Sequence, residues 1–221
     1  MTGMRDLKDV LHDQLREQRA ALLGELDGLS ERDARLPRTP TGTNLLGLLK
    51  HCATIEKGYF GRTFGREEPY PDPWDAPGAT PEDNLDMFAT EEETLAGILD
   101  YARACVEFAD ETIDSHPIDA EGRVPWWSAD KDEVTLGQIM AHVALDGARH
   151  AGHADILRER LDEVVGLRTP GDNVVEWTPN AGPPTEPASP TSPTPARAEG
   201  PRRADPARRA DQHDKLTSST S

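Results

Sequence analysis

The 221-residue sequence lacks any long, uninterrupted apolar segment. It contains no run of 18 apolar residues, and no apolar stretch follows a basic region at the N-terminus. The first absence argues against a membrane-spanning helix, and the second leaves no signal for export. We therefore expect a cytoplasmic protein with no membrane partner.

Basic residues are scarce relative to acidic ones, with 24 Lys and Arg against 41 Asp and Glu and a net charge of −17. The first 177 residues carry a net charge of −18, and residues 178–221 carry +1. A body of that charge repels a polyanion, so we expect no nucleic-acid partner. Two arginine pairs, at 202–203 and 208–209, stand beside aspartates that cancel much of their field, and we interpret them as part of a solvated linker.

Cysteine is rare too, and familiar catalytic motifs are missing. Cys52 and Cys105 each lie within an apolar helical pattern, which favours buried thiols in a reducing compartment over a disulfide. The sequence has no glycine-rich phosphate loop of the expected spacing, no nucleophile elbow and no paired-cysteine metal motif. Any chemistry must therefore come from other side chains.

Proline is unevenly distributed and divides the chain. Nine of the 19 prolines fall in residues 179–206, among Ser, Thr, Ala and Arg and almost no large apolar residue. Such a segment cannot bury enough surface to offset its ordering entropy. We predict one domain over residues 1–165 and a proline-rich, disordered tail over residues 166–221.

Four segments of that domain carry a helical period, and no segment of useful length alternates as a strand would. The helices are predicted at 4–29, from Thr43 as N-cap to about 65, from 81 or 84 to 113, and from 134 or 135 to 163. Two long irregular connections, 66–81 and 114–133, separate the last three. This pattern predicts an all-α four-helix bundle, not necessarily of simple up-and-down order.

Polar residues interrupt the apolar stripes of two helices. Asp146 and His150 lie four residues apart in the apolar arc of the fourth helix, so their side chains can converge on one atom. His51, at the edge of the stripe on the second helix, can reach the same point if the two helices are neighbours. Two imidazoles and a carboxylate suit a first-row divalent ion. An ordinary buried Asp–His hydrogen bond is the alternative interpretation of the same spacing.

Other polar and aromatic residues lie near this arc. His153 and Arg149 flank it and are weaker candidates for catalysis, with a half-buried structural histidine as the alternative for His153. Glu56 is better interpreted as an anchor between helices. Trp126 and Trp127 either wall a pocket or pack beneath the second connection.

Two motifs resemble a known family. The segments LLKHCATIEKGYFGRTF (48–64) and RHAGHADILRE (149–159) are similar to the actinobacterial mini-circle branch of the DinB-like superfamily, over roughly residues 5–163. The chain is also distantly similar to mycothiol-dependent maleylpyruvate isomerase. The resemblance implies a four-helix bundle of unusual connectivity, often dimeric, with a metal held by one histidine and a later pair four residues apart.

The pair at the matching positions departs from the family pattern. Relatives carry His and His or Glu and His there, whereas this chain has Asp146 and His150. The resemblance implies Zn or Ni at the site, a low-molecular-weight thiol such as mycothiol as cosubstrate, and a small-molecule substrate. It therefore favours a metal-dependent thiol S-transferase or isomerase. A non-catalytic metal-binding or stress-associated bundle, or an interaction module working through the tail, are the alternatives.

Overall fold

A computed structural model describes residues 4–80, 83–164 and 166. Contacts divide the chain into two units, Met1–Val175 and Glu176–Ser221. The second unit lies outside the described residues, and so does the predicted disordered tail apart from Gly166. The boundary that we predict at residue 165 remains a prediction.

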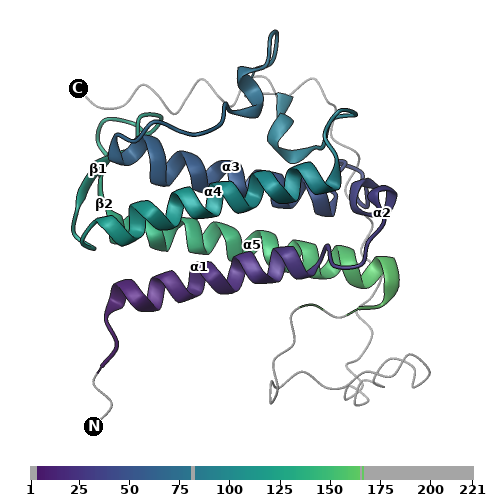
Figure 1. Cartoon of the computed structure of the whole chain (residues 1–221), viewed down its shortest axis with the longest axis horizontal. Coiled ribbons are helices and arrows are strands. Elements are labelled where there is room, and N and C mark those ends of the chain that lie inside the picture. Colours follow the sequence, from purple (N-terminus) through teal and green to yellow (C-terminus); the bar gives the residue numbers. More distant parts are fainter. Residues whose placement is uncertain (1–3, 81–82, 165, 167–221) are drawn as a thin grey trace, which may run out of the picture. The chain divides into compact units, whose positions relative to one another are not determined.

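The described residues are mostly helical, as the periodicity predicts. Five α-helices are present: α1 (Leu7–Gly24), α2 (Glu31–Arg35), α3 (Leu45–Gly61), α4 (Leu95–Ser115) and α5 (Leu136–Asp162). Short 3-10 turns η1 (Arg62–Phe64), η2 (Pro73–Asp75) and η4 (Leu85–Met87) lie between α3 and α4. Figure 1 shows the four longer helices side by side, with α3 against α4 and α5, and α1 against α5.

Side-chain caps fix the starts of these helices. The Asn44 side chain accepts a hydrogen bond from the Gly47 amide, so the N-cap of α3 is one residue later than the predicted Thr43. Thr135 caps α5 in a reciprocal pair with Gln138, as the predicted start allows.

Among the described helices, none is long and apolar enough to cross a membrane.

The predicted start of the third helix is wrong. Helix α4 begins at Leu95, after Thr94 as N-cap, rather than at 81 or 84. Residue Asn84 has a left-handed backbone (φ 51°), and Phe88 is extended, so only one 3-10 turn forms between them. The first predicted helix is also shorter than expected, ending at Gly24, and the unpredicted α2 occupies part of the following break.

A small antiparallel sheet closes one end of the helices. Strands β1 (Glu121–Arg123) and β2 (Glu133–Thr135) pair with Gly122 opposite Val134. A side chain on Gly122 would meet Phe64 and Thr63 at 2.8 and 2.9 Å, so the sheet lies directly on η1, the turn that follows α3. Three-residue strands give no periodic signal, which explains why the sequence did not reveal them.

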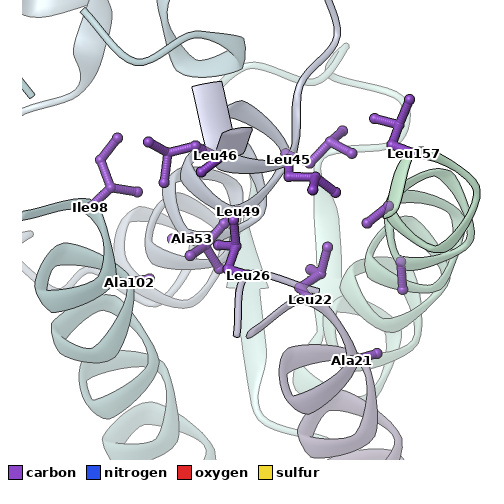
Figure 2. Close-up of a cluster of buried hydrophobic side chains, with 14 of the residues drawn as sticks. Ala21, Leu22, Leu26, Leu45, Leu46, Leu49, Ala53, Ile98, Ala102 and Leu157 are labelled. Atoms are coloured by element: carbon purple, nitrogen blue, oxygen red, sulfur yellow. The ribbon is translucent and has the colours of Figure 1, made fainter. Parts of the chain in front are cut away.

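The apolar core is built from all four long helices. Figure 2 shows Leu22 and Leu26 facing Leu45 and Leu49 of α3, with Ile98 of α4 and Leu157 of α5 around them. A second cluster lies toward the sheet and contains Phe60, Ile113, Val124, Leu136, Ile139 and Met140. Burial on this scale fixes the rotation of each helix, and with it the direction of every polar side chain on α3 and α5.

Candidate metal centre

His51 is positioned by the almost complete burial of α3. Apolar residues occupy the neighbouring faces of the helix, and the side chain of His51 itself is 17% exposed. Its two ring nitrogens point to different partners: Nδ1 lies 2.5 Å from Asp86 Oδ2, and Nε2 lies 3.8 Å from Asp146 Oδ2. The imidazole therefore bridges α5 and the α3–α4 connection.

Asp146 and His150 are positioned by the helical repeat of α5. Asp146 Oδ2 lies 3.7 Å from His150 Nε2, and the side chains are 28% and 14% exposed. The rings of His51 and His150 meet edge to face with centroids 4.7 Å apart. One candidate ligand atom from each of the three residues lies within 4.8 Å of the others. The structure thus brings together all three residues that the sequence singles out.

The separations between these atoms differ from those of a hydrogen bond. Both contacts of Asp146 Oδ2 exceed the roughly 3.2 Å upper range for N–H···O bonds. Ligands 2.0–2.2 Å from a tetrahedral zinc ion lie roughly 3.3 Å from one another. The observed spacing is closer to that of a ligand set than to the buried Asp–His hydrogen bond considered as the alternative.

The electrostatics of the three residues are unequal. Burial lowers the pKa of His51, but the contacts with Asp146 and Asp86 outweigh it and raise that pKa to about 9. Burial and the neighbouring His51 lower the pKa of His150, against the pull of Asp146. The contact with His51 lowers the pKa of Asp146 despite its burial. A carboxylate and one neutral imidazole are therefore already in the form that a metal ligand requires.

Asp86 is the residue that sequence reasoning missed. It lies in η4, is 7% exposed, and its carboxylate accepts the hydrogen bond from His51 Nδ1. Burial raises the pKa of Asp86, but the bond and charge of His51 outweigh it and lower that pKa. No local signal identifies Asp86, because the sequence places it inside a predicted helix, 35 residues from its partner.

An aromatic cluster continues along the same α3–α5 interface. The Tyr59 hydroxyl accepts a hydrogen bond from Trp127 Nε1 at 3.2 Å and lies 3.1 Å from His142 Nε2. Trp126 packs edge-on against Tyr59 and is 47% exposed. Because Tyr59 is eight residues after His51 and His142 is eight before His150, this cluster lies two helical turns from the candidate ligands.

The remaining candidates take different positions. Arg149 and His153 are exposed, and the His153 ring lies 5.5 Å from the His150 ring. Glu56 is 5% exposed and accepts from Arg19 of α1 at 2.5 and 2.9 Å, so it joins two helices as the sequence suggests. Both cysteine thiols are free, and burial raises the pKa of each, which leaves them as inert thiols.

Comparison with known proteins places the chain in a family. A family model described as mycothiol S-transferase matches residues 10–163. The chain belongs to the mycothiol S-transferase family. This confirms the resemblance to a DinB-like family that the two motifs indicate. Membership links the chain to mycothiol-related transfer and to a small-molecule substrate.

A comparison with solved structures supports the fold alone. A solved structure, a conserved protein from Enterococcus faecalis, matches with a TM-score of 0.55 and 15% identity. The match covers 73% of this chain and 100% of that one. No curated protein matches the chain. The family match and the site geometry therefore carry the functional argument.

Proposed function

We propose that the protein is a divalent-metal-dependent transferase that joins a low-molecular-weight thiol, mycothiol, to a small electrophilic substrate. An isomerase that uses the same thiol is the closest variant of this proposal. The observation that carries it is the convergence of His51, Asp146 and His150, in a chain of the mycothiol S-transferase family. We further propose that α1, α3, α4 and α5 form a DinB-like four-helix bundle around this site.

The donor set fits a first-row divalent ion. Two imidazole nitrogens and one carboxylate oxygen suit zinc or nickel. Asp146, which stands where similar proteins carry His or Glu, has an oxygen within 4.8 Å of both histidines. Within the described residues the group contains three members, so its ligand set leaves a coordination position for a thiol or water. That open position supports a catalytic site over a closed structural one.

The chain's own residues prepare the transfer. His150 supplies a neutral nitrogen, His51 would supply a second once the ion displaces the proton that its raised pKa retains, and Asp146 supplies a negative charge that offsets part of the cation's charge. When bound, a divalent ion lowers the pKa of a thiol so that its sulfur is nucleophilic at neutral pH. In the transfer, the thiol sulfur would form a bond to the electrophilic carbon while the leaving group departs with its electron pair and the thiol proton passes to solvent. Arg149 and His153 are proposed to orient an acidic group of the substrate.

The test combines metal content with thiol transfer. Elemental mass spectrometry on the native full-length protein is compared with His51→Ala, Asp146→Ala and His150→Ala, with His116→Ala as a matched histidine control at the end of α4. The same proteins are assayed for mycothiol transfer to an alkyl halide, with glutathione and cysteine as alternative thiols. We expect near-stoichiometric metal and transfer activity in the native and control proteins, and neither in the three variants.

The outcomes separate the competing functions. A native protein that is metal-free and cannot be loaded with zinc, nickel or manganese overturns the proposal. Stoichiometric metal without transfer to any tested thiol acceptor favours a non-catalytic metal-binding bundle instead. Loss of transfer on deleting residues 178–221, with metal retained, gives the tail a role. A homodimer and a cytoplasmic location remain predictions from the resemblance and from composition.

A further inference from the structure

The connection between α3 and α4 is attached to α3 beside the candidate ligands. Lys50 Nζ donates to the carbonyl oxygens of Leu85 and Phe88 at 2.7 and 2.9 Å, and pairs with Glu93 at 2.8 Å. The Lys50 side chain is 4% exposed, so these bonds replace water around a buried ammonium. The turn that contains Asp86 is therefore held at both of its ends by one side chain of α3.

Gly47 brings the same turn still closer to the helix. A Cβ at this position would lie 1.9 Å from the Met87 carbonyl oxygen, a distance that no side chain can occupy. Only glycine lets the backbone of the connection contact the first turn of α3. Gly47 and Lys50 together fix the backbone on both sides of Asp86, and Asp86 directs its carboxylate at the next residue of the helix, His51.

The two candidate imidazoles differ in how their second nitrogen is satisfied. Nδ1 of His51 donates to Asp86, whereas Nδ1 of His150 is buried and has no hydrogen-bond partner among the described residues. In its neutral form, an imidazole whose Nδ1 carries the bonded proton presents the lone pair of Nε2 on its other edge. For His51 that edge faces Asp146 and the ring of His150.

We propose that Asp86 is a positioning residue of the metal centre, which holds His51 in the Nδ1–H form with Nε2 directed at the ion. This inference rests on the proposed function, since it gives Asp86 a role only if His51 is a metal ligand. Carboxylates behind ligating histidines fix the ring and raise its basicity, and their loss costs about 10–100-fold in metal affinity. The connection between α3 and α4 is then part of the site.

A purely structural ion pair makes a different prediction. If Asp86 served only to attach the connection, its loss would lower folding stability and leave the affinity of a folded protein for metal unchanged. If it acts through His51, its loss lowers metal affinity, and the effect disappears when His51 is absent. These two alternatives can be separated by equilibrium binding.

The experiment measures zinc affinity of the full chain by competition with a chromogenic chelator. Asp86→Asn keeps the size of the side chain and removes its charge, and Glu92→Gln removes a charge from an exposed position in the same connection. We expect zinc to bind about 10–100-fold more weakly to Asp86→Asn and equally well, within about 2-fold, to Glu92→Gln. The Co(II) absorption spectrum of Asp86→Asn should also change, because the His51 ligand is reoriented.

Two further measurements keep the proposal open to refutation. In a His51→Ala background, titrated at zinc concentrations high enough to measure its residual affinity, Asp86→Asn should change that affinity by less than about 2-fold, because the two residues act as one unit. Gly47→Ala, which displaces the turn without touching Asp86, should weaken zinc binding in the same direction. Thermal unfolding of each metal-free variant shows that it is folded before its affinity is measured.

The failures of the two proposals are distinguishable. Tight zinc binding that depends on His51, Asp146 and His150 but is unchanged in Asp86→Asn overturns the role of Asp86 and leaves the metal centre intact. An equal loss of affinity from Asp86→Asn with and without His51 also overturns it, because Asp86 would then act independently of His51. Absence of zinc binding in the native chain overturns the metal centre itself.

Discussion

Two groups of buried or half-buried polar side chains lie at the interface of α1, α3, α4 and α5, and their hydrogen-bonding needs are met in different ways. In the first, Arg19 pairs with Glu56 at 2.5 Å and with Asp110 at 2.8 Å, and His12 contacts Asp110 at 2.8 Å. In the second, Asp146 Oδ2 lies 3.8 Å from His51 Nε2 and 3.7 Å from His150 Nε2. A cavity of about 30 Å³, lined by Arg19, Glu56 and Asp146 among others, lies between the groups.

This difference separates a structural cluster from a candidate site. The Arg19 cluster contains its own counter-charge, and each carboxylate receives at least one hydrogen bond. In the His51 cluster Asp146 Oδ2 lies beyond hydrogen-bond distance of both imidazoles, and His150 Nδ1 has no hydrogen-bond partner among the described residues. Ligand atoms that converge without hydrogen bonds to one another can accept a cation between them, so the incomplete cluster is the one that chemistry can use.

The largest expected effect on stability comes from removing the charge of Arg19 from the Arg19 cluster. Arg19→Met leaves Glu56 as an uncompensated charge at a nearly inaccessible position, and we expect a loss of about 3–5 kcal/mol in unfolding free energy. Arg16→Met, at an exposed position on the same helix, should cost less than about 0.5 kcal/mol. Urea unfolding measures both. Zinc stoichiometry should be unchanged, and a lost metal would show that the clusters are not independent.

A second expected effect tests whether buried oxygens without a hydrogen bond are by themselves enough to form a metal site. Glu25 and Asp155 each have one buried carboxylate oxygen with no hydrogen-bond partner among the described residues. Burial and the charge of Asp155 raise the pKa of Glu25 to about 7, against the opposing charge of Arg158. The folded protein therefore favours the protonated acid, and its stability falls as pH rises from the unfolded value of 4.5 through about 7.

The change Glu25→Gln should remove this pH dependence. We expect a gain of about 1–3 kcal/mol at pH 8 and little change at pH 4.5, measured by urea unfolding at both values. Glu159→Gln, at an exposed position of α5, is the matched control. Equal effects at the two pH values would mean that Glu25 is charged in the folded protein and that a proton does not satisfy this pair.

A third and smaller effect is a change in unfolding free energy that should have opposite signs in the two clusters. His150→Leu removes a buried nitrogen that has no partner in the part of the chain that the structure describes. The metal-free protein should therefore gain about 1 kcal/mol in unfolding free energy, while zinc no longer raises its melting temperature. His12→Leu removes a partner of Asp110 and should instead cost about 1–3 kcal/mol. Calorimetry with and without zinc checks both. If His150→Leu destabilised the metal-free protein, His150 would belong with the structural cluster.

The smallest expected effect concerns the rim of the candidate site. His153 is exposed beside His150, so His153→Ala should leave the zinc content unchanged. It should raise the KM for substrate by about 2–5-fold at constant kcat, because the lost contact would bind the ground state and the transition state equally. Steady-state kinetics measure this effect. A fall in zinc content would instead assign His153 to the ligand set.

Much of this protein is determined by the local sequence. Thr135 and the apolar repeat of α5 set the start of that helix, and the four-residue spacing of Asp146 and His150 places both on one face whatever the rest of the chain does. The pairing of His51 with them could be predicted only conditionally, because it requires α3 and α5 to be neighbours. The buried stripes of both helices supply that condition once the core forms.

Other features were decided only by tertiary structure. Lys50 draws the carbonyl oxygens of residues 85 and 88 onto α3 across more than 30 residues, and Gly47 admits the Met87 carbonyl. These contacts favour a 3-10 turn where the sequence predicts the start of a helix, and they bring Asp86 to His51. Hydrophobic periodicity reflects only the spacing of residues that are close in the sequence. It therefore cannot predict that a carboxylate from a distant turn contacts His51. The sequence determined which faces of α3 and α5 carry the candidate ligands, and the packing of a distant segment decided how His51 is held.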